Sequence, residues 1–590
     1  MPDLTSVDGS MPTQVFHLVA THRDGTMAPF NSGVWSLAST RLGTLVGGTS
    51  MPDQATFTAN GIVGGTLEIR ADGTGAGGAP LHATATLHVL LTRTLVVAGA
   101  PADSSLQFAS ATPDPTGARA NLLYPLDHAV MPNNVTPPDV QWEAGAAGDL
   151  YRIQIQKPDL TITAYVSHSG AGFRFDWPVD AAAWRTVAES DPGAEATIQV
   201  DLLHAATSRL VVGTPIHVTL TEQGVFGAVY YWAINEGRLL RIDPDTGMRE
   251  NFMPNPPSGC VACHTISRDG RYLAGSVDGS PRSLALFDLT RDLTAAPAPT
   301  VFNATLTYVF STFSPDGSRL LATGYGGDDG SGSDGFILLD AATGASVPAD
   351  NLPASHRVTH ADWSPDGQHV VYIGNVSGAA GPGPYPSHFT NGDVTLMSVS
   401  GTARLAFGTP TVLTQGTDLS TDMPPGAADA HPVWSPDSRV IAFQHGPVCY
   451  SQFNTLGALY VIRSTTGSRP VRLDQANGGP TGTSAFWPTF APYETNDGGT
   501  NHYWIAFFSQ RDYGNAQAGT RGAGRRQLWV TAVRAGGAAG DPSSVPYWLP
   551  GQDIASENAA AQWAASPCRA NASDCTVSSE CCSGRCLPDP

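Results

Sequence analysis

The segment Phe313-Ser314-Pro315-Asp316-Gly317, followed by the apolar run RLLATG at 319–324, decides the fold because it recurs along the chain. It returns as WSPDG at 363–367 before HVVYIG, and as WSPDS at 434–438 before RVIAFQ. Proline at the second turn position sets its own φ, and glycine at the fourth tolerates the exit conformation. Each copy therefore predicts a type I turn that joins two antiparallel strands. Two degenerate copies, SRDG at 267–270 and APYE at 491–494, extend the series.

A further strand follows each of these five units, as SLALFDL, FILLDAA, VTLMSVS, ALYVIRS and QLWVTAV. A sixth unit is assembled from two distant segments, in which residues 228–247 (AVYYWAIN and RLLRIDPDTG) supply outer strands and AAAQWA at 559–564 supplies the inner strand. Pairing strands from both ends of a ring removes its open sheet edges. The repeat therefore predicts a six-bladed β-propeller over residues 226–565.

The repeated SPDG pattern resembles the propeller repeats of TolB-type proteins, and this resemblance covers roughly residues 226–565. Before it, short alternating runs such as QVFHLVAT and GTLEIRA predict a β-sandwich over 1–100, similar to bacterial immunoglobulin-like domains. YRIQIQK and ITAYVSH predict a second sandwich over 101–225, which resembles a fibronectin-type domain. We assign no site residue to either sandwich. The predicted fold class is all-β, with two sandwiches, the propeller and a short tail.

Composition restricts the partners and the compartment. The net charge of -20 disfavours binding to nucleic acid or to anionic lipid, and no apolar run reaches the 18 residues that a transmembrane segment needs. The opening residues lack a basic and apolar secretory signal. Five cysteines crowd the predicted tail, 566–590, which resembles cystine-knot-like modules of secreted bacterial proteins; they are Cys568, Cys575, Cys581, Cys582 and Cys586.

An odd number of tail cysteines leaves three alternatives open. The chain continues to a sixth cysteine, one thiol stays free, or Cys449 pairs with the tail. Disulfide-rich segments persist in oxidising compartments. We therefore expect an exported protein in the periplasm, at the cell surface or outside the cell.

The chemical motif of the chain is Cys260-Val261-Ala262-Cys263-His264, which has the CxxCH spacing of a c-type haem site. The two thiols add to the haem vinyl groups, and the histidine next to the second cysteine ligates the iron. The alternatives are a zinc half-site and a redox disulfide. A structural zinc site normally needs four close ligands, and no second CxxC lies nearby in the sequence. Covalent haem attachment is also completed outside the bacterial cytoplasm, in agreement with export.

Aligning the repeats predicts where the haem motif lies. Cys263 falls in register with five later positions, and the six together are expected to form a ring around the mouth of the channel: Cys263, Phe310, His360, His431, Trp487 and Ala560. We expect His264 as the proximal iron ligand and His360 or His431 on the distal side. Met423, in the loop before His431, is the alternative distal ligand. Asp328, Asp329 and Asp334 in GGDDGSGSDG could hold calcium, but a solvated loop without an ion is the favoured interpretation of this segment.

A haem c in a six-bladed propeller resembles the middle domain of the hydrazine synthase alpha subunit, with CVACH at the position of its haem motif. Because that family carries a second haem region and this chain has a single CxxCH, hydrazine chemistry does not follow. The first hypothesis is a mono-haem electron-transfer protein that exchanges electrons with a protein partner or a small oxidant or reductant. The second is a peroxidase-like haem enzyme with His360 or His431 as the acid or base. The third is a haem-free scaffold that binds a protein or a glycan.

Overall fold

The structure, a computed structural model, describes residues 3–75, 78–259, 261–277, 283–324, 335–354, 357–379, 389–449, 456–536 and 540–566. The chain divides into two compact units. The first contains residues 1–222 together with 514–519, and the second contains 223–513 and 520–590. The division after residue 222 lies close to the boundary at 225 and 226 that the sequence predicts.

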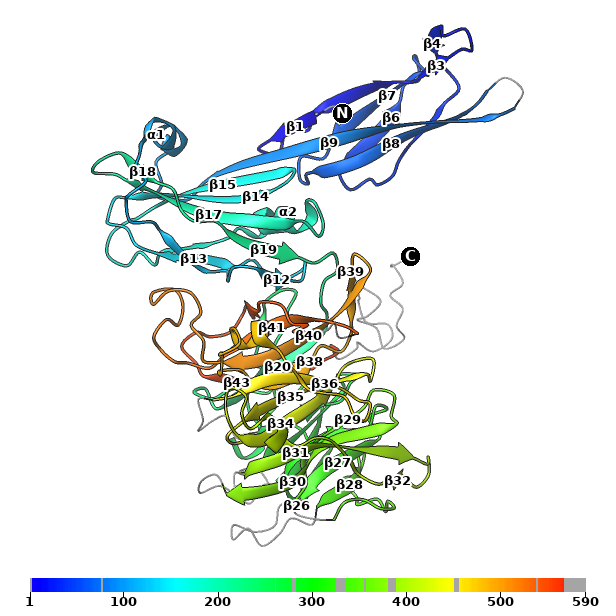
Figure 1. The fold of residues 1–590 in the computed structure, drawn as a ribbon, viewed down its shortest axis with the longest axis vertical. Coiled ribbons are helices and arrows are strands. Elements are labelled where there is room, and N and C mark those ends of the chain that lie inside the picture. The colour runs from blue at the N-terminus through cyan, green and yellow to red at the C-terminus, as the bar shows by residue number, and fades with distance from the viewer. Residues whose placement is uncertain are drawn as a thin grey trace. The chain divides into compact units, whose positions relative to one another are not determined.

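In the first unit, one sheet crosses the boundary expected at residues 100 and 101. The long strand β9 (Pro80–Val96) pairs with β8 (Gly65–Thr74) on one side and with β15 (Leu160–Ser167) on the other. The sheet continues through β14 (Leu150–Lys157) and β17 (Glu195–His204), as Figure 1 shows. Alternating buried residues on β7 (Gln54–Ala59) and β8 face a core around Phe57 and Leu87. The two predicted sandwich regions therefore share a sheet, because β9 is long enough to serve both.

Loop 514–519 is held in the first unit by Asn515, which is 2% exposed. Its Nδ2 donates to the carbonyl oxygens of Trp142, Arg174 and Phe175 at 2.9 to 3.1 Å. Its Oδ1 accepts from the backbone N–H groups of residues 517 and 518. One side chain therefore satisfies two backbone groups of the loop and three of the segments beside it, as buried polar groups require.

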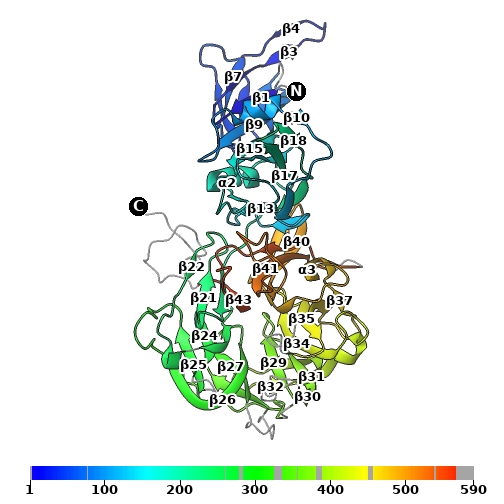
Figure 2. The ribbon, with the colours of Figure 1, turned by 90° about the vertical axis from the view of Figure 1, so that its left-hand side faces the viewer.

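In the second unit, the described strands form six blades, which are the sheets arranged around a common centre in Figure 2. The first two blades share β26, whose first part pairs with β25 and whose second part pairs with β27. The strands of these two blades are β23 (Ala262–Ile266), β24 (Tyr272–Val277), β25 (Ser283–Asp288), β26 (Phe302–Phe313), β27 (Arg319–Gly324) and β28 (Phe336–Asp340). Their shared core contains Leu284, Leu286 and Leu320, which are fully buried.

The next three blades follow the order of the chain. The third contains β29 (Thr359–Trp363), β30 (His369–Ala379), β31 (Phe389–Ser400) and β33 (Thr411–Thr414). The fourth contains β34 (Ala427–Trp434), β35 (Val440–Gly446), β36 (Ala458–Arg463) and β37 (Val471–Arg472). The fifth contains β38 (Phe486–Phe490), β40 (Thr500–Ser509), β41 (Gln527–Arg534) and β42 (Tyr547–Trp548).

The sixth blade closes the ring. Its inner strand, β43 (Asn558–Ala564), pairs antiparallel with β20 (Ala228–Ala233), with Trp563 opposite Val229. The outer strands are β21 (Arg238–Ile242) and β22 (Arg249–Glu250). β43 also contacts β23 of the first blade and β38 of the fifth. The predicted six-bladed closure is confirmed, and the structure is all-β as expected.

The SPDG turns have the predicted geometry. Ser314 Oγ donates to Asp316 Oδ1 at 2.6 Å and accepts from the N–H of Arg319 at 2.9 Å. The N–H of Gly317 donates to the Ser314 carbonyl at 2.8 Å, and its φ of +68° is a conformation that glycine adopts at little cost. The copies at 364–367 and 267–270 repeat these bonds. The turn is therefore built by local hydrogen bonds, which is why the sequence predicts it.

None of the helices in the described residues combines the length and apolar character needed to cross a membrane. The longest is α2 (Ala181–Glu189), and α1 (Ser104–Ser110) and α3 (Asp474–Asn477) are shorter.

Candidate functional site

The inner strands of the propeller each carry an irregularity at the same position. The register of every inner strand shifts at the residue predicted to face the channel, as between Ala262 and Thr265 in the first blade. Five of these six ring residues have a left-handed φ between +47° and +53°: Cys263, His360, His431, Trp487 and Ala560. β-bulges turn side chains away from the regular alternation of a strand. The bulges thereby direct the ring residues, including Phe310, toward one axis.

The aromatic members of the ring pack in a continuous stack. The imidazoles of His360 and His431 stack with centroids 3.9 Å apart, and His431 stacks on Trp487 at 3.8 Å. Phe310 meets His360 edge to face at 4.2 Å. The structure therefore brings His360 and His431 together across 71 residues of sequence, in agreement with the predicted register.

The hydrogen bonds of His264 fix its tautomer. Its Nε2 is buried and has no hydrogen-bond partner among the described residues, and a backbone hydrogen bond with Tyr230 acts on the ring. Because Nε2 is the atom without a partner, we assign this bond to a protonated Nδ1, which leaves a lone pair on Nε2. Iron-ligating and zinc-ligating histidines commonly have this arrangement. His264 therefore presents a ligand atom to the cavity that it lines.

The Nε2 atoms of His431 and His360 differ in protonation: one carries a lone pair and the other carries a proton. A backbone hydrogen bond with Cys449 acts on the His431 ring, and Nε2 of His431 has no partner in the described part of the chain. We assign this bond to a protonated Nδ1, as in His264, which leaves a lone pair on Nε2. Nδ1 of His360 instead accepts the backbone N–H of His431 at 3.4 Å. The proton of neutral His360 then lies on Nε2, which makes that atom a donor and not a ligand.

Burial keeps all three imidazoles neutral. Each is 5% exposed. Burial lowers the pKa of His264 to about 4 and that of His431 to about 3. Burial, and then the neighbouring His431, lower the pKa of His360 well below its ordinary value. The lone pairs of His264 and His431 are therefore available at neutral pH, because no proton competes for them.

The three histidines line a cavity of about 60 Å³. A water molecule takes about 30 Å³ of liquid, so the space suits about two waters or a small ion. Sites for drug-sized ligands and cofactors occupy roughly 300 to 1,000 Å³. The cavity itself is therefore too small for an organic substrate, and a haem bound to His264 would have to extend beyond it. Cys263, at its edge, is only partly buried.

A charged pair lies at the turn end of the inner strands. Arg268 Nη2 lies 3.4 Å from Asp362 Oδ2 and donates to the Trp363 carbonyl at 2.5 Å. Asp362 also accepts from Trp434 N–H at 2.8 Å and from Thr312 Oγ1 at 3.1 Å. Burial raises the pKa of Asp362, and Arg268 acts against that rise. Sequence reasoning missed this pair, although the signal was present: Arg268 replaces the proline of the SPDG turn.

A fully buried acid and imidazole also escaped the sequence analysis. Asp429 Oδ1 and His445 Nδ1 are 2.7 Å apart, and both side chains are 0% exposed. Burial raises the pKa of Asp429 to about 6. No spacing in the sequence distinguishes them, since each lies on a strand of ordinary apolar alternation. They are not among the residues that line the histidine cavity.

The remaining predicted site residues either lie outside the described residues or lie away from the histidine cavity. Cys260, the calcium candidates Asp328, Asp329 and Asp334, and the tail cysteines lie outside the described residues. Met423 is 48% exposed and is not among the described residues that line the cavity. The structure therefore does not bring this methionine to the histidines. Cys449 is 1% exposed, and burial raises the pKa of its thiol to about 12.

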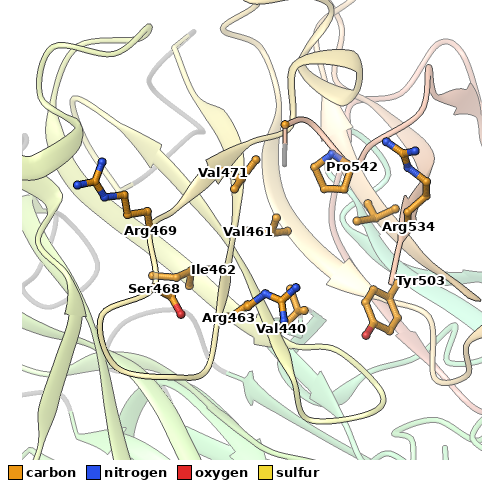
Figure 3. A pocket seen from close by; sticks show the side chains of 12 residues that line it. Val440, Val461, Ile462, Arg463, Ser468, Arg469, Val471, Tyr503, Arg534 and Pro542 are labelled. Carbon is orange, nitrogen blue, oxygen red and sulfur yellow. The ribbon is translucent and has the colours of Figure 1, made fainter. Parts of the chain in front are cut away.

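A larger cavity of about 250 Å³ lies between the fourth and fifth blades. Its walls are apolar, with Val461 and Val471, and three arginines stand at its edge: Arg463, Arg469 and Arg534. Figure 3 shows the guanidinium groups of Arg469 and Arg534 on opposite sides of the cavity. The hydroxyl of Tyr503 there donates to Asp437 at 2.7 Å. Because the positive groups do not converge, we do not assign a ligand to this cavity.

Comparison with solved structures finds propeller proteins. The chain is similar to TolB from Acinetobacter baumannii at 14% identity and a TM-score of 0.32, over 63% of this chain and 86% of that chain. It is also similar to Kuenenia stuttgartiensis hydrazine synthase, at 13% identity and a TM-score of 0.26, over 53% of this chain and 73% of that chain. The similarity to the dihydro-heme d1 dehydrogenase NirN has 14% identity and a TM-score of 0.28, and it covers 52% of each chain. A scan against protein-family models gives no match, and neither does a search of curated proteins. We base the propeller assignment on strand pairing, because these similarities are too weak to support more.

Proposed function

We propose that this protein carries one covalent haem c, attached through Cys260 and Cys263, with His264 as the proximal ligand, and that it transfers electrons. The observation that supports the proposal is Nε2 of His264. This atom is buried, neutral at physiological pH and without a hydrogen-bond partner among the described residues. An orphaned buried ring nitrogen is costly unless something binds it.

The residues of the motif fit the group in chemical terms. Two thiols supply the covalent links, and a histidine oriented through Nδ1 supplies the axial ligand, while the haem supplies one-electron redox chemistry. His431 is the better distal candidate, because its Nε2 carries a lone pair. His360 is suited to donating a hydrogen bond to a group held nearby.

Electron transfer is a better proposal than peroxidase-like catalysis. The cavity of about 60 Å³ that His360 and His431 line is filled on one side by their stack with Trp487. Such a space excludes an organic substrate, although a peroxide of a few atoms would still fit. Electron transfer needs no substrate cavity, only a redox partner or a small oxidant or reductant at the surface. The same motif and the cysteine-rich tail support our proposal that the protein is exported.

Covalent haem is tested by expressing the full chain in a bacterial host with cytochrome c maturation. We expect a pyridine haemochrome spectrum with one haem per chain that survives denaturing electrophoresis. Cys263→Ala should reduce covalent haem strongly. Cys449→Ala is the matched control, because it removes a thiol outside the motif, and it should retain the haem.

His264→Ala should keep the covalent links and change the axial ligation, seen as a shift of the Soret band and of the midpoint potential. A chain without covalent haem would contradict the proposal. If the intact mass of that haem-free chain is two hydrogens below the mass expected with both motif thiols reduced, the motif is a redox disulfide. If it instead contains zinc that Cys263→Ala loses, the motif is part of a zinc site.

A further inference from the structure

A cluster of two histidines and a carboxylate lies in the first unit, far along the sequence from the haem motif. Asp127, His128 and His217 each offer a ligand atom, and these atoms lie within 4.8 Å of one another. Asp127 Oδ1 is 3.2 Å from His217 Nδ1, and Asp127 Oδ2 is 3.7 Å from His128 Nε2. A fourth side chain, Glu195, places Oε2 3.6 Å from His128 Nδ1.

Strand register explains why these residues meet. β12 (Ala129–Met131) runs parallel to β19 (Ile216–Leu220), with Ala129 beside Val218. His128 and His217, one residue earlier on each side, are therefore lateral neighbours at the spacing of paired strands. Their rings are parallel within 9°, with centroids 5.1 Å apart. Glu195 enters from β17, which pairs with the other edge of β19.

The backbone fixes the cluster on both sides. The N–H of His217 donates to Asp127 Oδ1 at 2.8 Å, and the N–H of His128 donates to the carbonyl of His217 at 2.7 Å. Slight burial raises the pKa of Asp127, but the hydrogen bonds from His217 outweigh it and hold that pKa below its usual range. Asp127 is therefore a carboxylate at neutral pH, and its position does not depend on the identity of the His217 side chain.

We propose that Asp127, His128 and His217 bind one divalent transition-metal ion of the zinc class. Zinc binds imidazole nitrogen and carboxylate oxygen at about 2.0 to 2.2 Å, so two ligands of one ion lie at most about 4.4 Å apart. The observed separations need only small side-chain movements to reach this limit. Imidazole ligands favour zinc, copper or nickel over calcium or magnesium.

The side chains are 32% to 63% exposed, so the ion would keep positions open to water. Two histidines and a carboxylate with open positions are typical of sites that bind a further ligand. The ion would also join the start of β12 to β19. Metal binding should therefore stabilise the first unit, because the unfolded chain does not assemble these ligands. This inference is independent of the proposed haem function.

The test uses the full chain and Zn²⁺ alone, with equilibrium dialysis and metal analysis. His217→Ala and Asp127→Asn should each weaken zinc binding at one site by about 100-fold or remove one zinc equivalent. Residues that only hydrogen-bond a metal ligand already change metal affinity by about 10- to 100-fold, so losing a ligand should cost at least as much. The matched control is His82→Ala, which removes an exposed histidine paired with one aspartate at 2.6 Å. It should bind zinc as the wild type does.

Two further measurements separate this site from thiol sites elsewhere in the chain. Co²⁺ bound at the cluster should give visible bands without the charge-transfer absorption of a cobalt–thiolate bond. Zn²⁺ should raise the thermal midpoint of the wild type and of His82→Ala, but not that of His217→Ala. If His217→Ala does not fold, His217→Gln removes the ligand and keeps the backbone hydrogen bond. Equal zinc stoichiometry and affinity in wild type, His217→Gln and Asp127→Asn would overturn the proposal.

Discussion

The backbone N–H of His431 donates to Nδ1 of His360 over 3.4 Å, while the two imidazoles stack 3.9 Å apart. This relationship makes two equivalent ring positions chemically different. His360 carries its proton on Nε2 and is a hydrogen-bond donor, whereas His431 bonds the Cys449 backbone and keeps a lone pair on Nε2. A donor and an acceptor therefore face the same small cavity.

The tautomers can be observed directly by ¹⁵N NMR of histidine side chains. In the haem-free Cys260→Ala, Cys263→Ala double variant, we expect His264 and His431 as Nδ1–H tautomers and His360 as the Nε2–H tautomer. All three should stay neutral from pH 5 to pH 8, because burial lowers the pKa of His264 to about 4 and that of His431 to about 3. Protonation of His431 near pH 6.5 would contradict the assignment.

Acid should destabilise the propeller through His431. Its native pKa of about 3 lies below the ordinary value of 6.5, so the unfolded chain takes up a proton that the native chain does not. The free energy of unfolding is therefore unaffected by the titration of His431 above pH 6.5. Between pH 6.5 and pH 3 it falls by about 1.4 kcal/mol per pH unit. His431→Phe keeps the stack with Trp487 and removes the titration. Its thermal midpoint should start lower at pH 7 and fall less steeply between pH 6 and pH 4; parallel curves would refute this.

Arg268→Pro should destabilise the protein even though it restores the SPDG turn. The substitution removes the ion pair with Asp362, which leaves a largely buried carboxylate without its cation. Because the two side chains are 31% and 22% exposed, we expect a loss of about 1 to 3 kcal/mol, less than for a fully buried pair. The pKa of Asp362 rises further without Arg268, so the loss should shrink as the pH falls and the acid becomes protonated.

Two comparisons test that explanation. Arg439→Ala breaks an ion pair in which the arginine is 83% exposed, and it should change stability by less than about 1 kcal/mol. Asp362→Asn combined with Arg268→Pro should be less destabilised than Arg268→Pro alone, because no charge is left buried. A larger loss in the double variant would mean that Arg268 acts through its bond to the Trp363 carbonyl.

Closure of the ring should depend on β43. A chain that ends after Asp553 lacks this strand and leaves β20 with an open edge, so we expect aggregation or loss of the cooperative thermal transition. A chain that ends after Ser566 keeps β43 and is the matched control. Trp563→Ala should cost about 3 to 5 kcal/mol, since the indole is 5% exposed and its Nε1 donates to the Phe226 carbonyl at 3.1 Å. Wild-type stability in the shorter chain would exclude closure by this strand.

The tail cysteines should form at least two disulfides between residues 568 and 586 when the protein is exported, because five neighbouring thiols do not stay reduced in an oxidising compartment. Alkylation without reductant, followed by mass spectrometry, counts the free thiols. Cys449 is expected to stay reduced, since it is 1% exposed within the core of the third and fourth blades. Alkylation of all five tail thiols without reductant would contradict both the bridges and export.

The sequence alone determined the features that depend on local chemistry. The SPDG turns are made by Ser314 and Asp316 hydrogen bonds within five residues, so their recurrence counts blades and sets the register of the inner strands. That register placed His360 and His431 on the same ring as Cys263. Closure by 559–564 also followed, because an incomplete unit at one end of a ring needs the strand that the other end supplies.

Only the tertiary structure decided how these residues act. Which nitrogen of His360 carries the proton depends on a backbone N–H 71 residues away, and no local pattern records that contact. The same holds for Arg268 and Asp362, which come from different blades, and for His128 and His217, which are neighbours because β12 and β19 pair in parallel. Sequence periodicity reveals which face a strand buries, but which strands become neighbours, and how their polar atoms pair, is fixed by long-range packing.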